Sequence, residues 1–182
     1  QLTDTLELTV EQGKKTGHII GIHEDCHENV WVLTEHRLFV FDKHHRPLTT
    51  RGAAWNGICS ITETTDGSIW LGTQNGELIR THTENGHIDV DARYKCPKVL
   101  NTHNTIRFLC HGNKDNVWIA TDLGGLYEFI PTHRKLVNHT AGCLQQEAPI
   151  LNLLSSGPYI WVTTPSATIR YNPASQRRQV YS

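Results

Sequence analysis

Twelve histidines and five cysteines make metal binding the first chemistry to consider for this chain. His23 and His27 are four residues apart, the spacing at which two ligands share one side of a helix. The local pattern is a strand followed by a turn, so we expect this pair and His44-His45 to be solvated side chains. The cysteines form no Cys-x-x-Cys pair and no Cys/His cluster at zinc spacing. The sequence therefore predicts no metal site and no cofactor.

Catalytic motifs are also missing from the sequence. Serine, histidine and aspartate are plentiful, but no nucleophile with a plausible base, no phosphate-binding loop and no paired carboxylates stand out. We therefore expect no catalytic residues and no enzyme activity in this segment.

Aromatic and amide residues that lie close together suggest a third chemistry, the binding of a small polar ligand. The pairs Trp55-Asn56 and His103-Asn104 each precede an expected strand. An indole face stacks on a sugar ring, and amide and imidazole groups bind its hydroxyls. Structural roles remain open, because Trp55 can pack in the core and both asparagines, two residues before an Ile, can cap a turn.

A repeated strand must position these residues, and four of the five tryptophans mark it. Each of the four follows a branched aliphatic residue and starts a short run that ends in Thr, a composition typical of a buried strand. The successive spacings of 39, 48 and 43 residues indicate a repeat architecture. The four copies are Asn29–Thr34, Gly67–Thr73, Asn116–Thr121 and Tyr159–Thr164.

Further short strands accompany each tryptophan strand. An aliphatic strand and a turn precede it, and a hairpin and two more strands follow. Four-stranded antiparallel units of roughly 43 residues with one buried aromatic predict an all-β fold, a β-propeller segment. We expect residues 1–182 to form a single segment with blades near 18–50, 57–95, 105–140 and 149–182, and 1–17 as a lead-in or outer strand. Four blades are few, so the segment closes on itself, belongs to a larger propeller or associates as a homodimer.

The second unit carries the pattern I-x-x-I-x-E-x-x-D-G-x-I-W-L-G-T-x-x-G-x-L-x-R from Ile58 to Arg80. This unit resembles the two-component regulator propeller repeat. The third unit, with Asp122–Tyr127, is similar, and the fourth departs most, with Ser156–Tyr159 in place of the acidic-Gly turn. The resemblance covers roughly residues 18–182. It implies the periplasmic sensor domain of a bacterial hybrid two-component system, a histidine kinase and response regulator that detects an extracellular signal, often an oligosaccharide.

Ligand sites of propellers usually lie on the face formed by the loops that enter each first strand and the turns that follow each second strand. The candidate ligand-binding residues on this face are Trp55, Asn56, His103 and Asn104 in the entering loops and His36, Arg37, Gln74 and Asp122 in the turns. The residues expected to fill the space between blades are Trp31, Trp70, Trp118 and Trp161.

The leading interpretation is a non-enzymatic, periplasmic ligand-sensing module for an oligosaccharide or similar small molecule. An alternative is a propeller lyase resembling the streptogramin-inactivating enzymes, which share the element Val30–Glu35 and rely on a His and bound Mg²⁺. A plain protein-interaction propeller is the third possibility.

Charge and composition limit the classes of binding partner that we expect for this chain. With 17 basic and 18 acidic residues the net charge is −1, which carries no electrostatic signature of nucleic-acid or anionic-membrane binding. No apolar run approaches the roughly 18 residues of a membrane helix, so we expect membrane attachment only through parts outside this chain. The chain starts at Gln1 and contains no Met, which suggests a piece of a longer protein. An odd number of cysteines argues against a complete disulfide framework but leaves one bridge possible.

Overall fold

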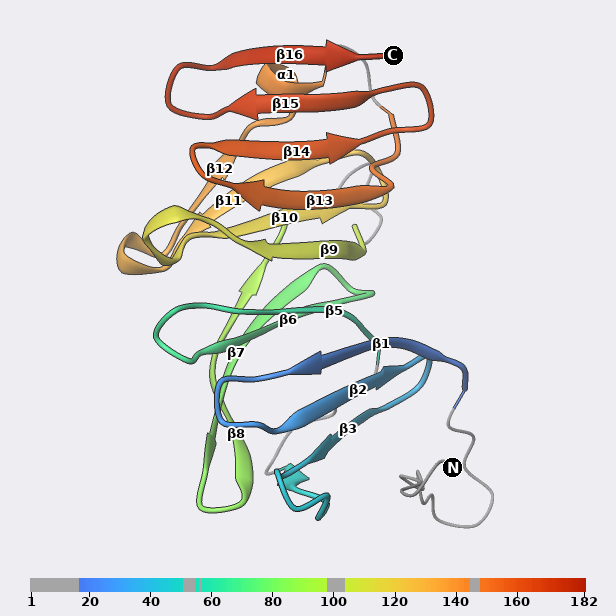
Figure 1. The fold of residues 1–182 in the computed structure, drawn as a ribbon, viewed down its shortest axis with the longest axis vertical. Coiled ribbons are helices and arrows are strands. Elements are labelled where there is room, and N and C mark those ends of the chain that lie inside the picture. The colour runs from blue at the N-terminus through green and yellow to red at the C-terminus, as the bar shows by residue number, and fades with distance from the viewer. Residues whose placement is uncertain (1–16, 51–54, 56, 98–103, 145–147) are drawn as a thin grey trace.

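The computed structural model describes residues 17–50, 55, 57–97, 104–144 and 148–182. The chain in these ranges forms four β-sheets that follow one another in chain order along the long axis of the molecule (Figure 1). Each sheet is built from strands that are consecutive or nearly consecutive in the sequence. The described chain is therefore a row of repeated units.

Strand order across each sheet follows the chain, except that β4 lies at the edge of the second sheet. The first sheet contains β1 (Ile19–Glu24), β2 (Val30–Thr34) and β3 (Leu38–Phe41). The second contains β5 (Ile58–Glu63), β6 (Ile69–Thr73), β7 (Glu77–Glu84), β8 (His87–Lys95) and β4 (Thr49–Thr50). The third contains β9 (Ile106–His111), β10 (Val117–Thr121), β11 (Leu126–Ile130) and β12 (Lys135–Asn138). The fourth contains β13 (Asn152–Ser156), β14 (Tyr159–Thr163), β15 (Thr168–Asn172) and β16 (Arg177–Tyr181).

The sheets are arranged as propeller blades. Within each sheet, neighbours that are consecutive in the chain pair antiparallel. The first strands of consecutive sheets contact each other, β1 against β5, β5 against β9 and β9 against β13. These first strands are therefore the inner strands, and the later strands of each sheet extend outward. The predicted fold class, an all-β propeller segment with four blades, is confirmed.

The number of strands differs from the predicted four in the first two blades. Pro47 makes an isolated bridge with Phe41, and the Leu48 amide donates to the carbonyl of Val40 at 2.8 Å. The chain then leaves this blade, and β4 pairs in parallel with β8 of the second sheet. Proline has no backbone N–H to continue a ladder, which accounts for the interrupted fourth strand. The first sheet has three strands and the second has five.

Three of the four repeated tryptophans lie between blades. Trp31 packs against Ile58, Ile69 and other residues of the second sheet and is 0% exposed. Trp70 lies in the same way against the third sheet and Trp118 against the fourth, with 1% and 2% of their surfaces exposed. Each blade thus buries its indole against the next blade along the chain.

Trp161 has the same place in the fourth sheet but is only half-buried. Tyr181 stacks on its ring at 5.8 Å, and Leu154, its neighbour across β13 and β14, is 59% exposed. At the other end of the row, Ile22 of β1 is 66% exposed. Both terminal sheets of the described chain therefore present apolar side chains that interior sheets bury.

Close approach of the second and third blades requires the glycine after Trp70. A β-carbon on Gly72 would lie 2.4 Å from Cγ2 of Ile106 and 2.3 Å from Oγ of Ser60. The Ser60 hydroxyl also donates to the carbonyl of Ile106 at 2.9 Å. Glycine at this position lets the inner strands β5 and β9 pack directly.

Turns between first and second strands hold the indole N–H groups. Trp31 Nε1 donates to Oδ2 of Asp25 at 2.8 Å, and Trp70 Nε1 donates to Oγ1 of Thr64 at 3.1 Å. Asp25 and Thr64 begin equivalent turns, because their amides donate to the carbonyls of Asn29 and Ser68 at 3.0 Å. These two turns satisfy the one polar atom of the Trp31 and Trp70 indoles.

Helices are few and short in the described chain. They are the 3₁₀ turns Asn113–Asp115 and Pro131–His133 and α1 (Thr140–Cys143). None of these helices has the length and hydrophobicity of a transmembrane segment. Cys143 of α1 is buried in the cluster between the third and fourth sheets, and all five cysteines are free.

The position of each tryptophan in the row predicts the cost of removing it. Trp70→Ala should lower the free energy of unfolding by about 3–5 kcal/mol, because it leaves a cavity between two blades. Trp161→Ala should cost about 1 kcal/mol, because this ring is partly solvated. Urea unfolding followed by circular dichroism measures both. Equal costs would contradict the assignment of Trp161 to an open face.

The indole caps give a second stability prediction. Thr64→Val should lower the free energy of unfolding by about 1–3 kcal/mol, since it leaves the buried N–H of Trp70 without an acceptor. The matched control is Thr132→Val, at an exposed threonine for which the structure shows no side-chain hydrogen bond, and it should change stability by less than about 0.5 kcal/mol. Thermal and urea unfolding of both variants test the difference, and a Thr64→Val protein as stable as its control would refute the capping role.

Candidate functional site

The loops that enter the first strands and the turns that follow the second strands lie together at one end of the sheets, which we call the candidate face. The Glu35 amide donates to the carbonyl of His18 at 3.0 Å. In the next two blades the Gln74 amide donates to Gly57 at 2.8 Å and the Asp122 amide to Thr105 at 3.1 Å. This repeated backbone bond fixes each turn against the start of its own inner strand.

The repeated threonine at the end of each tryptophan strand shapes these turns. Its hydroxyl accepts a hydrogen bond from a backbone N–H three or four residues later, at distances between 2.9 and 3.2 Å. Such side-chain-to-backbone bonds favour tight turns. The four threonines are Thr34, Thr73, Thr121 and Thr164.

Gln74, Asn104 and Asp122 meet where the second and third blades join. Thr105 connects them, because its hydroxyl donates to the Gln74 carbonyl at 3.1 Å and its carbonyl accepts from the Asp122 amide. A β-carbon on Gly76, two residues after Gln74, would lie 2.9 Å from the Asn104 carbonyl oxygen. Gln74 and Asp122 are exposed, so their side chains are free to meet a ligand.

The first blade contributes His36 and Arg37 to the same face. His36 is exposed and Arg37 is partly buried. The Arg37 amide donates to Oγ1 of Thr34 at 3.0 Å, which holds this turn in the conformation of the others. An imidazole and a guanidinium therefore lie at the same end of the sheets as Gln74 and Asp122.

Trp55 and Asn104 are buried rather than displayed on the candidate face. Trp55 is 7% exposed and belongs to the cluster around Trp31, and its Nε1 has no hydrogen-bond partner among the described residues. Asn104 is 2% exposed, and within the part of the chain that the structure describes its side-chain oxygen and nitrogen also lack partners. These positions favour packing for Trp55, the alternative that the sequence left open. Asn56 and His103, the other two candidates, lie outside the described residues.

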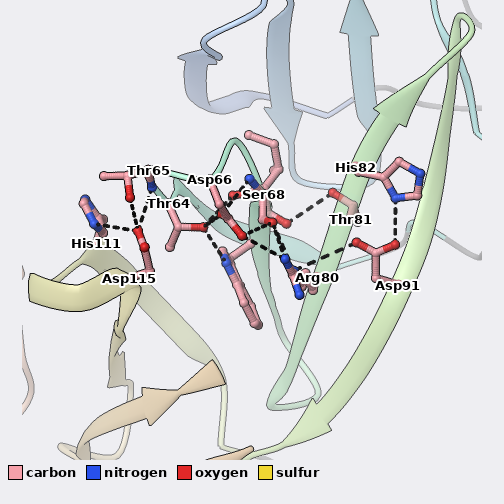
Figure 2. Close-up of polar contacts among 12 residues, drawn as sticks. Thr64, Thr65, Asp66, Ser68, Arg80, Thr81, His82, Asp91, His111 and Asp115 are labelled. Carbon is pink, nitrogen blue, oxygen red and sulfur yellow. Dashed lines mark hydrogen bonds and ion pairs between the residues drawn. The ribbon is translucent and has the colours of Figure 1, made fainter. Parts of the chain in front are cut away.

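A polar network that the sequence analysis did not single out lies at the other end of the second sheet, which we call the opposite face (Figure 2). Arg80 donates to Oδ2 of Asp66 at 2.9 Å and to Oγ of Ser68 at 2.7 Å, and its guanidinium lies 5.7 Å from the Trp70 ring. Asp91 extends the network, with one carboxylate oxygen 4.0 Å from Arg80 and the other 2.7 Å from His82. The turn after β5 is thereby tied to the hairpin of β7 and β8.

Each carboxylate of this network has a hydrogen-bond or ion-pair partner within the protein. Burial alone would raise the pKa of Asp66, but hydrogen bonds from Thr64 and Ser68 and the charge of Arg80 lower it. Thr65 bonds to Asp115 of the third sheet through both its amide and its hydroxyl, and His111 lies 3.5 Å from the same carboxylate (Figure 2). The network joins two blades, and its donors and acceptors bond to one another.

A second cluster lies between the third and fourth sheets. Glu128 accepts from Nδ2 of Asn116 at 2.7 Å and lies 3.2 Å from Nε2 of His139, whose Nδ1 is 3.0 Å from the hydroxyl of Tyr171. The hydrogen bond to His139 lowers the pKa of Glu128 and outweighs the opposing effect of burial. This carboxylate is therefore ionised near neutral pH.

The strand register of the repeat indicates where both polar clusters lie, and this signal can be read from the sequence. Opposite three of the four tryptophans, the third strand carries a charged residue: Arg80 for Trp70, Glu128 for Trp118 and Arg170 for Trp161, whereas Val40 lies opposite Trp31. Where that indole is buried, as for Trp70 and Trp118, the charged residue beside it needs partners. Aligning the four units on tryptophan marks these positions.

The described part of the chain contains no cluster of side chains that could bind a metal ion. No group of three or more His, Cys, Asp or Glu side chains there has a metal-binding arrangement. His23 lies 3.6 Å from Glu63, and the two residues belong to neighbouring sheets.

The candidate face offers exposed hydrogen-bonding groups that suit the binding of a polar molecule. These groups are the side chains of Gln74, Asp122 and His36.

Comparison with known proteins places the chain by its fold. No protein-family model matches it, and no match is found among curated proteins. Among solved structures, it is similar to two structures of the extracellular domain of BT4673 from B. thetaiotaomicron, described as a putative one-component or hybrid two-component system, with a TM-score of 0.72 and 22% and 21% identity over 94% of this chain. Streptogramin B lyase gives 0.71 and 14% identity over 95% of the chain, and the WD40 repeats of RRP9 give 0.72 and 8% identity over 93%.

These three proteins have different functions and nearly equal TM-scores, so the likeness shows the fold. The chain spans 26% of the BT4673 structure, 57% of the lyase and 52% of the RRP9 repeats. The described chain is a segment with the blade arrangement of a β-propeller.

Proposed function

We propose that this chain is part of an extracytoplasmic ligand-sensing propeller of a hybrid two-component signal-transduction protein. The observation that carries the proposal is the repeat at Ile58–Arg80, which resembles the two-component regulator repeat, in a chain whose fold matches the BT4673 extracellular domain over 94% of its length. Identity to that domain is 22%, against 14% for the lyase and 8% for the WD40 repeats. The module itself is non-enzymatic, and a histidine kinase would belong to other parts of the protein.

The ligand in this proposal is an oligosaccharide or a similar small polar molecule in the periplasm. Sugar hydroxyls donate and accept hydrogen bonds, and the exposed amide of Gln74 and carboxylate of Asp122 offer both kinds of partner. Trp55 is buried, so it contributes to the site by packing beneath the face rather than by stacking on the sugar.

Signalling would follow from differential binding. Gln74 belongs to the second blade and Asp122 to the third, and Thr105 bonds to both turns. A ligand that contacts both turns favours the blade arrangement in which they are correctly spaced, and this preference biases any element attached to the blades.

Binding measurements on the chain test the proposal. A panel of neutral and acidic oligosaccharides is screened by thermal shift, and hits are quantified by isothermal titration calorimetry. Asp122→Asn and Gln74→Ala should each weaken the affinity of a hit about tenfold, the effect of losing one good hydrogen bond. Glu28→Gln, a change at an exposed carboxylate on the opposite face, should leave it unchanged. A panel without any hit, or hits that tolerate both face variants, would count against the proposal.

A lyase related to the streptogramin-inactivating enzymes is the alternative, favoured by the Thr34-Glu35 element and the similarity to streptogramin B lyase. The chain is incubated with a type B streptogramin and Mg²⁺, and ring opening is followed by mass spectrometry. The sensing proposal predicts no turnover. Turnover that disappears with a chelator would establish the lyase instead.

A further inference from the structure

The third blade lacks the side chain that caps its tryptophan. The Gly112 amide donates to the Asn116 carbonyl at 2.7 Å, which makes Gly112 the equivalent of Asp25 and Thr64. A β-carbon on Gly112 would lie 2.6 Å from Nε1 of Trp118, so the indole occupies the space of the missing cap. Trp118 is 2% exposed as a residue, but its Nε1, which donates no hydrogen bond to any residue in the described ranges, is not among the fully buried atoms without a partner. An N–H that has no protein acceptor and faces an open cavity can donate to a water or a ligand there.

An open cavity of about 350 Å³ lies at this indole, between the third and fourth sheets. Trp118, Asn116, Glu128 and His139 line it from the third blade and its connections. The fourth sheet and its turns contribute a largely apolar wall, with Pro158, Ile160, Pro173 and Ala174. The cavity is on the opposite face, away from Gln74 and Asp122.

Lys114 brings a positive charge to the cavity. Its backbone is in the left-handed region, with φ of 58°, and its side chain is exposed at the cavity rim. The adjacent carboxylate, Asp115, is occupied by Thr65 and His111 of neighbouring strands and turns (Figure 2). Lys114 makes no ion pair with another residue of the described chain.

Three features of the cavity can bind a ligand: the indole N–H of Trp118, the ammonium group of Lys114, and the ionised carboxylate of Glu128, which already contacts Asn116 and His139 but has further lone pairs to offer. A simple anion would bind the first two but meet repulsion from Glu128. A simple cation would bind Glu128 but would accept no hydrogen bond from Trp118 or Lys114. A neutral polyol can bond to all three groups but compensates neither charge. A molecule with both charges close together satisfies every group.

We propose that this cavity binds a small α-amino acid, with the ammonium group on the Glu128 carboxylate and the carboxylate group on Trp118 Nε1–H and Lys114. The apolar wall of Pro158, Ile160 and Pro173 receives the side chain of the amino acid. Asn113 helps to fix the two walls, because its Nδ2 donates to the carbonyl of Gly157 at 2.9 Å across the junction. The site is separate from the candidate face and does not depend on the proposed sensing function.

Titration calorimetry with matched probes tests this site. L-Alanine is the probe, L-lactate lacks its ammonium group, ethylamine lacks its carboxylate, and glycerol is a neutral polyol. The proposal predicts that L-alanine binds and that each of the other three binds at least about tenfold more weakly. Binding of glycerol or ethylamine as tight as that of L-alanine would overturn it. So would the absence of L-alanine binding at about 10 mM.

Two variants locate the binding. Lys114→Gln removes an exposed charge without touching the core, and Glu128→Gln keeps the shape of its side chain. Each should weaken L-alanine binding at least about tenfold. Lys135→Gln, at an exposed lysine on β12 of the same blade, should leave binding unchanged. Melting temperatures check that the variants are folded. If Glu128→Gln unfolds the protein, the Lys114→Gln variant still tests the site. Wild-type affinity for L-alanine in the Lys114→Gln variant would refute the site.

Discussion

Burial of one indole face against the next blade is the interaction on which the structure depends. A single sheet of this kind has two faces to cover and cannot cover both by itself. Trp31, Trp70 and Trp118 cover one face of each interior junction, and aliphatic side chains of the following sheet cover the other. Trp161 repeats the arrangement without a following sheet in the described chain, so its ring and Leu154 remain partly solvated. The stability of each blade is therefore set by its neighbours.

Because of this packing, the turns at the two ends of the sheets have different roles. On the opposite face, the turns after the first strands approach the indoles and must satisfy a buried N–H, which Asp25 and Thr64 do. On the candidate face, keeping the turn in shape requires only backbone bonds and the repeated threonine, as at Thr73 and Thr121. The neighbouring side chains Gln74 and Asp122 are left exposed. A ligand that contacts both would bridge two blades.

The fold could be predicted because its signals are local and repeated. The position of tryptophan within a short strand, the spacing of the copies and the glycine turns all depend on a few adjacent residues. The interrupted first blade was not predicted, because the pairing of Thr49–Thr50 with β8 joins residues almost forty positions apart. A proline at residue 47 indicates only that the ladder ends, not where the chain goes next.

The candidate site was less predictable, because burial depends on contacts between blades. Trp55 lies just before an inner strand, and the sequence cannot say whether its ring points to solvent or joins the cluster of Trp31. The partnership of Glu128 with His139 likewise combines a third strand with a later connection. The place of Gln74 and Asp122 on the candidate face was predictable because they occupy equivalent turns, a property of the repeat itself.

Hydrogen exchange on the chain, with and without an oligosaccharide that binds it, tests the central claim most directly. If the candidate face senses the ligand, amide exchange should slow in the turns after β6 and β10, around Gln74 and Asp122, and stay unchanged in the turns around Asp66 and Asn113. Protection confined to those opposite-face turns, or no protection in either set, would contradict the assignment of ligand sensing to the candidate face.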